Sequence, residues 1–176
     1  WARHLIRVRD LQVETGSFTE FVPLPFVASE SPVYLKGRAR RGPSFREAVL
    51  MHAVARIVFH GYISNIQTSW VKMGHRGVIA CLGAGANDLG GTLMNESITR
   101  AAGAAHGQET NPSVMLDMIS GANRIPRPRT TIYSDLSSDR LETALEAGEL
   151  SEIINSPAKK YERRDRRKLI RSSANV

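Results

Sequence analysis

Short apolar runs that end in polar residues recur along this chain, and they restrict the folds that it can adopt. Three of these runs are FTEFVPLPFV (18–27), NIQTSWVKMG (65–74) and GANDLGGTLMNES (85–97). Segments with helical periodicity separate them, and no hairpin signal joins neighbouring runs. Such alternation of strands and helices predicts an α/β fold with a parallel sheet. Ligands bind where the strands of such a fold end, so the polar residues there are the first candidates for a site.

The boundaries of the expected elements follow from capping and helix-ending residues. A first helix extends from residue 1 to Gly16, a typical helix stop. Ser44 and Glu47 form a capping box that begins a second helix, which Gly61 ends. The other expected elements are, in chain order, a strand at 18–27 that leaves the sheet at its prolines, a polar connection at 28–43, a strand at 62–70, a helix at 74–82, a short strand before 87–88, helices at 95–105 and 112–121, and a strand at 129–133. These units are too few to close an eight-stranded barrel alone.

The net charge of +7 is concentrated near the C-terminal end of the 176 residues. Residues 159–171 contain eight Lys or Arg, two acidic residues and a single aromatic residue. So dense a charge leaves little apolar surface to bury, which predicts a disordered basic tail at 159–176. We expect 1–136 to form the folded part and 137–158 to add a helix. A nucleic-acid or polyanion binding module is the alternative from another class of function. The tail lacks the interleaved aromatic residues of a stacking platform, so a nucleic-acid partner is not expected.

Other kinds of site and location are disfavoured by the sequence. No apolar run approaches the roughly 18 residues that a membrane span needs. Cys81 is the single cysteine, so an internal disulfide is excluded and a reducing cytoplasm is the expected location. Its apolar surroundings, VIACLG, predict a buried side chain and not a nucleophile. The five histidines show no metal-binding spacing and no G-x-S-x-G elbow is present, so neither a metal site nor a serine-hydrolase site is expected from this chain.

Polar residues at the expected strand ends are the candidate ligand contacts. Glu20 lies in an apolar strand, where its carboxylate needs either a ligand or an arginine from a neighbouring strand as its partner. Gln67 offers a donor and an acceptor, and Trp70 offers a flat face that either stacks on a ligand or packs in the core. Asp88 precedes Gly90, and it either accepts hydrogen bonds from a ligand or closes an Asx turn. The full set of candidate contacts is Glu20, Gln67, Ser69, Trp70, Asn87, Asp88, Gly90, Thr92 and Glu96.

In their residues and in their order along the chain, the segments at 18–27, 65–74 and 85–97 resemble the carboxy-terminal part of the 7,8-didemethyl-8-hydroxy-5-deazariboflavin (FO) synthases. That family consists of radical S-adenosylmethionine enzymes with a TIM-type (β/α) barrel. The resemblance covers about residues 1–133 and fades beyond them. It implies deazaflavin biosynthesis, in which a 4-hydroxybenzyl group from L-tyrosine is transferred to 5-amino-6-(D-ribitylamino)uracil. It also implies S-adenosyl-L-methionine and a [4Fe-4S] cluster as cofactors. The radical enzymes of futalosine-dependent menaquinone synthesis are the alternative, and FTEFVPLPF with NIQTSWVKMG favours the deazaflavin branch.

One feature of that family is missing from this sequence. The family holds its cluster with a C-x-x-x-C-x-x-C motif, and this chain has Cys81 alone. We therefore expect the chain to be the carboxy-terminal part of a barrel, inactive by itself and unable to bind the cluster. Its expected partners are the missing amino-terminal half of the barrel and a partner FO synthase domain or subunit. A non-radical barrel enzyme such as a lyase would need a Lys or metal base, for which the sequence offers no position.

Overall fold

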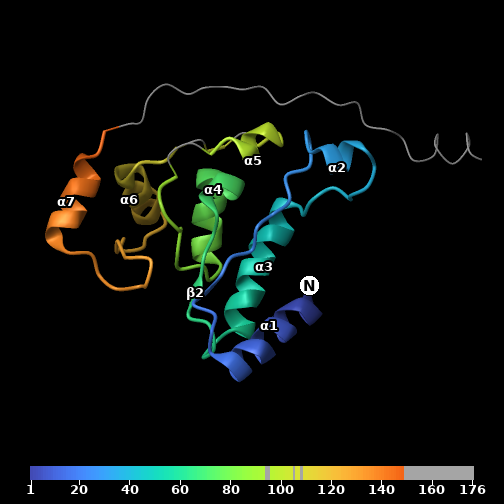
Figure 1. The fold of residues 1–176 in the computed structure, drawn as a ribbon, viewed down its shortest axis with the longest axis horizontal. Helices are drawn as coiled ribbons and strands as arrows, with labels where there is room; N and C mark the ends of the chain where they lie inside the picture. Colours follow the sequence, from blue (N-terminus) through green and yellow to red (C-terminus); the bar gives the residue numbers. More distant parts are fainter. Residues whose placement is uncertain (94–95, 105, 108, 149–176) are drawn as a thin grey trace, which may run out of the picture.

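Helices account for most of the regular secondary structure in the computed structural model, which describes residues 1–93, 96–104, 106–107 and 109–148 (Figure 1). The elements are, in chain order, α1 Ala2–Thr15, β1 Glu20–Phe21, α2 Pro32–Leu35, α3 Phe45–Val58, β2 Asn65–Ile66, α4 Trp70–Gly83, α5 Ile98–Ala101, α6 Pro112–Gly121 and α7 Ser138–Glu146. None of the helices described is long and apolar enough to cross a membrane. The predicted tail at 159–176 and the second half of the predicted helix at 137–158 lie outside the described residues.

Three segments of the chain run parallel next to one another. β1 pairs with β2, and Glu20 lies opposite Asn65. Just beyond β2, Gln67 forms a parallel bridge with Asp88. The prediction of an α/β fold is therefore confirmed in its coarse form, a small parallel sheet among helices. The further strands of a TIM-type barrel stay a prediction.

The helix predicted from a capping box is present as α3. The Glu47 N–H donates to Oγ of Ser44 at 3.3 Å, and the Ser44 N–H donates to Oε2 of Glu47 at 2.7 Å. These two bonds satisfy backbone donors that a helix start leaves unpaired, which explains why α3 begins at this point. α3 then runs to Val58 and carries Arg56, which donates to the carbonyl of Ser64 just before β2.

The predicted strands are longer than the observed ones. Pro23 and Pro25 lack the N–H groups that a longer β1 would need, and regular pairing stops at Phe21. Of the predicted strand at 62–70, Asn65–Ile66 form β2 and Gln67 adds a single bridge. The prediction is wrong on both sides of these residues, because Tyr62 lies in a turn and the next helix begins at Trp70.

That next helix, α4, begins four residues before the predicted start at Gly74. It includes Trp70, and its two helical stretches meet at Gly74, which has φ 63° and ψ 177°. Such a conformation is open to glycine but strained for other residues. The space is also restricted, because a Cβ added at Gly74 would lie 2.8 Å from the His106 ring. The sequence therefore indicated the second half of the helix and missed its first turn.

The strand predicted at 129–133 is wrong, and this segment forms a turn. The Thr130 N–H donates to the carbonyl of Ser134 at 2.8 Å, and the two hydroxyl oxygens are 2.7 Å apart. Tyr133 has φ 63°, which no regular strand allows. The predicted helix at 95–105 is observed, in its described part, only as the short α5.

α3 packs against two sets of elements (Figure 1). On one side α1 and β2 contribute Leu5 and Ile66, which close over Phe59 at the end of α3. On the other side α4 packs against α3 and contributes Cys81, and α6 packs on α4 and adds Met118 to the same cluster. The prediction that Cys81 is buried is confirmed, because none of its surface is exposed. The core thus fixes α3 and α4 and, through them, the strand ends between them.

Candidate functional site

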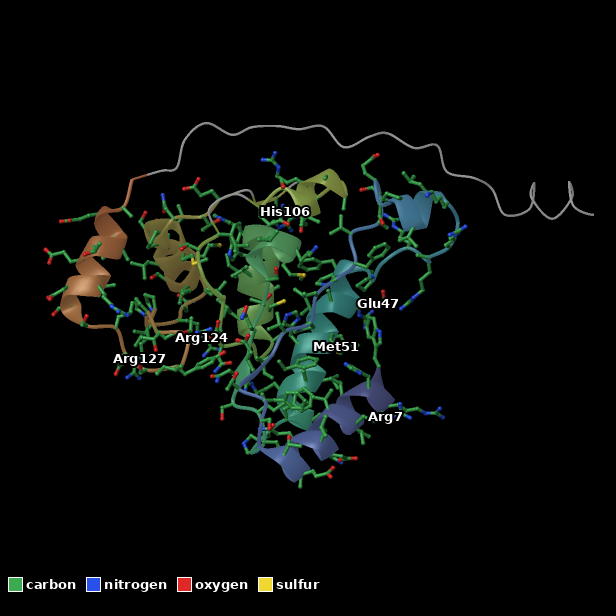
Figure 2. The ribbon with its side chains drawn as sticks, in the orientation of Figure 1. Arg7, Glu47, Met51, His106, Arg124 and Arg127 are labelled. Carbon is green, nitrogen blue, oxygen red and sulfur yellow. The ribbon has the colours of Figure 1, made fainter. Side chains whose placement is uncertain are left out.

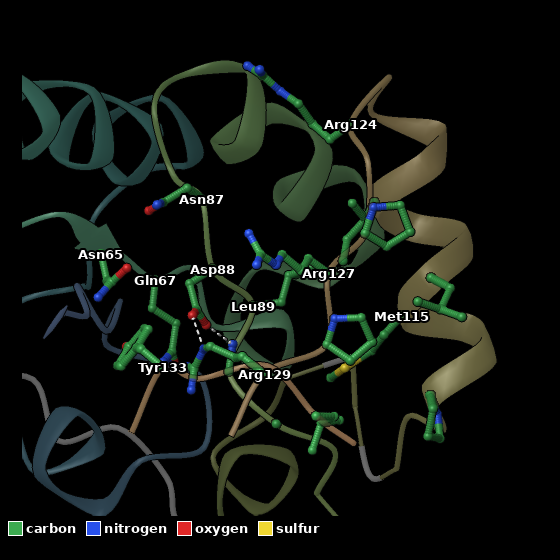
Figure 3. Close-up of a pocket in the computed structure, with 18 of the residues that line it drawn as sticks. Asn65, Gln67, Asn87, Asp88, Leu89, Met115, Arg124, Arg127, Arg129 and Tyr133 are labelled. Atoms are coloured by element: carbon green, nitrogen blue, oxygen red, sulfur yellow. Dashed lines mark hydrogen bonds and ion pairs between the residues drawn. The ribbon is translucent and has the colours of Figure 1, made fainter. Parts of the chain in front are cut away.

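The parallel segments face a broad pocket of about 1420 Å³. Glu20, Gln67 and Asp88 line it from the sheet, and the loop 124–136, together with α6, lines it as well. Figure 3 shows the Asp88 and Arg129 side chains pointing toward one another, with those of Gln67 and Tyr133 beside them. Figure 2 shows Arg124 and Arg127 on the side of the molecule that holds α6 and α7. A pocket of this size, lined by both apolar and polar groups, suits an organic ligand.

Glu20 has protein partners both in the parallel segments and in the loop 124–136. The Tyr133 hydroxyl donates to Oε2 of Glu20, and Gln67 donates to the same oxygen through Nε2 at 3.1 Å. Nη2 of Arg129 lies 3.8 Å from this oxygen. Of the two partners that the sequence left open for Glu20, an arginine is therefore present, although it comes from the loop 124–136 and not from a strand.

Asp88 is held on both of its carboxylate oxygens. Oδ1 accepts from the Gly90 N–H at 2.6 Å, which is the Asx turn considered from the sequence. Oδ2 accepts from Nε of Arg129 at 2.5 Å. The Asp88 side chain is 7% exposed and that of Arg129 is 26% exposed, so little water competes for this ion pair. Donation to Asp88 raises the pKa of Arg129, in spite of an opposing effect of burial.

Arg129 and Tyr133 are the site residues that the sequence reasoning missed. The Arg129 guanidinium carbon lies 4.0 Å from the centre of the Tyr133 ring, a cation–π contact. Burial, and then donation to Glu20, raises the pKa of Tyr133. A usable signal was present, since Glu20 and Asp88 are carboxylates beside apolar runs and both require a cation or donor from elsewhere in the chain.

Asn87 braces β2 and the residue before it. Its Oδ1 accepts from Nη2 of Arg56 at 2.6 Å and from the Ile66 N–H at 2.9 Å, and its Nδ2 donates to the Ser64 carbonyl at 3.2 Å. Arg56 also donates to the carbonyls of Gly85 and Ser64, at 2.7 and 2.8 Å. The Asn87 side chain is thus used by the protein itself, although the residue lines the pocket.

Trp70 packs in the core, and Gly90 makes room for a neighbour. Trp70 is 5% exposed and donates through Nε1 to the Gly91 carbonyl at 3.2 Å. Gly90 has φ 73°, and a Cβ placed there would lie 2.6 Å from Oε1 of Gln67. The core role of Trp70, one of its two alternatives, is therefore the observed one, and Gly90 allows Gln67 to approach the backbone.

The last three candidates differ in their positions. Ser69 precedes α4 without capping it through its side chain, and Thr92 is exposed on the pocket wall. Glu96 accepts from the Thr99 N–H and hydroxyl, both at 2.9 Å, and Lys72 donates to the same hydroxyl at 2.9 Å. The Glu96 carboxylate therefore stabilises the start of α5 and lies outside the residues that line the pocket.

A metal cluster does not fit the donors of this chain. Within the described ranges, no group of three or more His, Cys, Asp or Glu is arranged to hold a metal ion. The single thiol, Cys81, is buried, and burial raises its pKa. Its sulfur lies 3.5 Å from Nδ1 of His52, whose pKa is lowered by burial. Because a [4Fe-4S] cluster is held by several cysteine thiolates, this chain cannot hold one alone.

Comparison with known proteins gives a family match over most of the chain. Residues 15–140 match the family described as the CofH/MqnC C-terminal region. The FO synthase of Mycobacterium tuberculosis (strain ATCC 25618 / H37Rv) is 53% identical over 138 residues, which is 78% of this chain and 16% of that protein. The FO synthase of Streptomyces coelicolor is 44% identical over 155 residues, or 88% of this chain and 18% of that protein.

A shorter relative is named for a tyrosine transferase. The 5-amino-6-(D-ribitylamino)uracil–L-tyrosine 4-hydroxyphenyl transferase of Methanopyrus kandleri is 51% identical over 133 residues. The match covers 76% of this chain and 36% of the transferase. This chain therefore spans less than a fifth of the two FO synthases and about a third of the transferase.

Proposed function

This chain belongs to the CofH/MqnC C-terminal region family, and we propose from that premise that it forms the substrate-facing end of an FO synthase. The reaction is the transfer of the tyrosine-derived 4-hydroxybenzyl group to 5-amino-6-(D-ribitylamino)uracil in deazaflavin biosynthesis. The names of the relatives support this choice over the menaquinone branch, because the M. kandleri relative is named for tyrosine and this uracil. The polyanion-binding alternative has no support among the described residues, since its basic tail lies outside them.

The observation that carries the proposal is the polar cluster at the strand ends. Glu20, Gln67 and Asp88 come from three parallel segments, and Arg129 and Tyr133 from the loop 124–136 complete the cluster. It lies in a pocket of about 1420 Å³, which has room for a ribityl chain and a phenol together. Hydrogen-bond acceptors fixed in this way suit a substrate that is rich in hydroxyl and amino donors.

The role of this chain in the reaction is to bind and orient substrate. Radical enzymes of this family use S-adenosyl-L-methionine and a [4Fe-4S] cluster to generate the radical. The donors of this chain do not fit the cluster, so we propose that its ligands come from outside this chain. The described residues then hold the substrate close to the reacting atoms and limit the access of water.

We propose that a further part of the barrel completes the site, either in the same protein or in a partner FO synthase subunit. Two large apolar side chains that follow β1 support this idea. Leu24 is 63% exposed and Phe26 is 40% exposed. Further strands packed beside β1 would cover them and lengthen the sheet.

A chimeric enzyme tests the proposed function. Residues 15–140 of this chain replace the matching part of the M. kandleri transferase, and anaerobic product formation from tyrosine and 5-amino-6-(D-ribitylamino)uracil is measured by mass spectrometry. We expect the chimera to form the same product as the unmodified transferase. A chimera that folds, keeps its iron content and forms no product would contradict the proposal.

A further inference from the structure

The two pocket carboxylates that lie at the ends of the parallel segments, Glu20 and Asp88, differ in how many of their oxygens the protein itself uses. The Asp88 side chain is 7% exposed, and both of its oxygens accept hydrogen bonds, one from Gly90 and one from Arg129. Glu20 is 35% exposed in its side chain, five times as much as Asp88. A ligand that enters the pocket therefore reaches the Glu20 carboxylate far more easily than that of Asp88.

The contacts of Glu20 are all made by one oxygen. Oε2 accepts from the Tyr133 hydroxyl and from Nε2 of Gln67, and it lies 3.8 Å from Nη2 of Arg129. Oε1 accepts from no residue in the described part of the chain. A carboxylate has lone pairs on both oxygens. Three neighbours thus hold Glu20 by one oxygen and leave the other available inside the pocket.

We propose that Glu20 is the carboxylate that contacts the ligand, through Oε1, and that Asp88 is a positioning residue that acts through Arg129. The ligand group at Oε1 is a hydrogen-bond donor, an amine or a hydroxyl. A metal ion is a poor fit, because no third acidic, histidine or cysteine side chain joins these two in the described residues. The inference rests on the proposed function, in which two substrates carry such donors: the ammonium of L-tyrosine and the ribityl hydroxyls of the uracil.

Two isosteric variants of the 176-residue chain separate the two roles. Binding of each substrate is measured by isothermal titration calorimetry for the wild type, Glu20→Gln and Asp88→Asn. Each substrate is paired with an analogue that lacks the donor: 3-(4-hydroxyphenyl)propionate for tyrosine and 5,6-diaminouracil for the ribityl compound. For the substrate whose donor meets Oε1, we expect Glu20→Gln to weaken binding by about tenfold or more. With the matching analogue, the same variant should change the Kd by less than about twofold.

Asp88→Asn gives the contrasting result. Because Asp88 acts through Arg129, its replacement should weaken the binding of the substrate and the binding of the donor-lacking analogue by the same factor. The inference is overturned if Glu20→Gln binds both substrates like the wild type, or if its loss of affinity is equal for substrate and analogue. If the 176-residue chain binds neither substrate, the same variants are compared in the chimeric transferase, where equal affinity of Glu20→Gln and the chimera without it overturns the inference.

Chemical labelling provides a measurement that needs no variant. Carbodiimide with a small amine modifies accessible carboxylates, and peptide mapping reads each site. We expect Glu20 to be modified and Asp88 to be spared, and bound substrate to protect Glu20 without protecting Glu14, an exposed acid on α1. Equal modification of Asp88 and Glu20, or no protection of Glu20 by either substrate, would overturn the inference.

The chimeric transferase distinguishes this inference from the proposed function. If the chimera forms product and its Glu20→Gln form is equally active, the function stands and the role of Glu20 is refuted. If the chimera is folded and keeps its iron content but is inactive, the proposed function fails, whatever the binding and labelling measurements give.

Discussion

Arg129 donates through Nε to Oδ2 of Asp88 at 2.5 Å, and this bond links the loop 124–136 to the end of the third parallel segment. The two residues are 41 positions apart in the sequence. Arg129 also lies over the Tyr133 ring, whose hydroxyl donates to Glu20. The ion pair therefore does more than join two charges, because it places the loop so that Tyr133 reaches the first strand.

Replacement of Arg129 by Gln should destabilise the protein. The Asp88 side chain, which is 7% exposed, would lose its cation and remain a charge with little access to water. We expect the free energy of unfolding to fall by about 2 kcal/mol, measured by urea denaturation followed by circular dichroism. Arg127→Gln is the matched control, because Arg127 pairs with Asp135 while 78% of its side chain is exposed. Such an exposed pair contributes little. Equal losses in both variants would contradict the importance given to the Arg129–Asp88 pair.

Gly90→Ala should damage the site through the backbone and through Gln67. Gly90 has φ 73°, and the added Cβ would lie 2.6 Å from Oε1 of Gln67. The left-handed conformation alone costs about 1–2 kcal/mol for a residue with a Cβ, and the displaced Gln67 amide would lose its bond to Glu20. We expect thermal denaturation to show a lower midpoint. Gly91→Ala is the control, since nothing lies within 4 Å of a Cβ added there, and it should be tolerated.

The sheet-side half of the candidate site could be predicted from the sequence because its signals are local. Glu20, Gln67 and Asp88 each stand next to a short apolar run, and the alternation of runs and helices places the ends of such runs together. The three residues do line one pocket. The parallel pairing of the segments was predictable for the same reason, whereas the short length of the strands depends on which neighbours are present.

The other half of the site depends on contacts over long sequence distances. The segment RTTIY at 129–133 is rich in β-branched residues, which favours a strand, yet hydrogen bonds between Thr130 and Ser134 close a turn. The sequence also could not show whether the Asn87 side chain contacts a ligand or the protein, because its partner Arg56 lies far away in the sequence, on α3. A single sequence shows that a polar group exists at these positions but does not show which other group uses it.

Cys81 should be unreactive in the folded protein. It has no exposed surface, and burial raises its pKa, which disfavours the reactive thiolate. We expect almost no reaction with Ellman's reagent in native buffer and one thiol per chain in denaturant. Ser17→Cys adds a cysteine at an exposed position, and this variant should show one rapidly reacting thiol in native buffer. Rapid labelling of Cys81 itself would contradict the packing of α4 against α3.

Tyr133 should make the protein sensitive to alkaline pH. Burial and donation to Glu20 raise its pKa in the folded state above the ordinary value of about 10. A group with a raised folded pKa contributes stability that is fully present below the unfolded pKa and is lost as the pH rises through the folded pKa. The urea midpoint of the wild type, relative to that of Tyr133→Phe, should therefore be constant up to about pH 9 and decline above about pH 10. Tyr62→Phe, which removes an exposed tyrosine, controls for the loss of one phenol. A difference between wild type and Tyr133→Phe that stays constant to pH 11 would show that the Tyr133 hydroxyl does not hold its proton through Glu20.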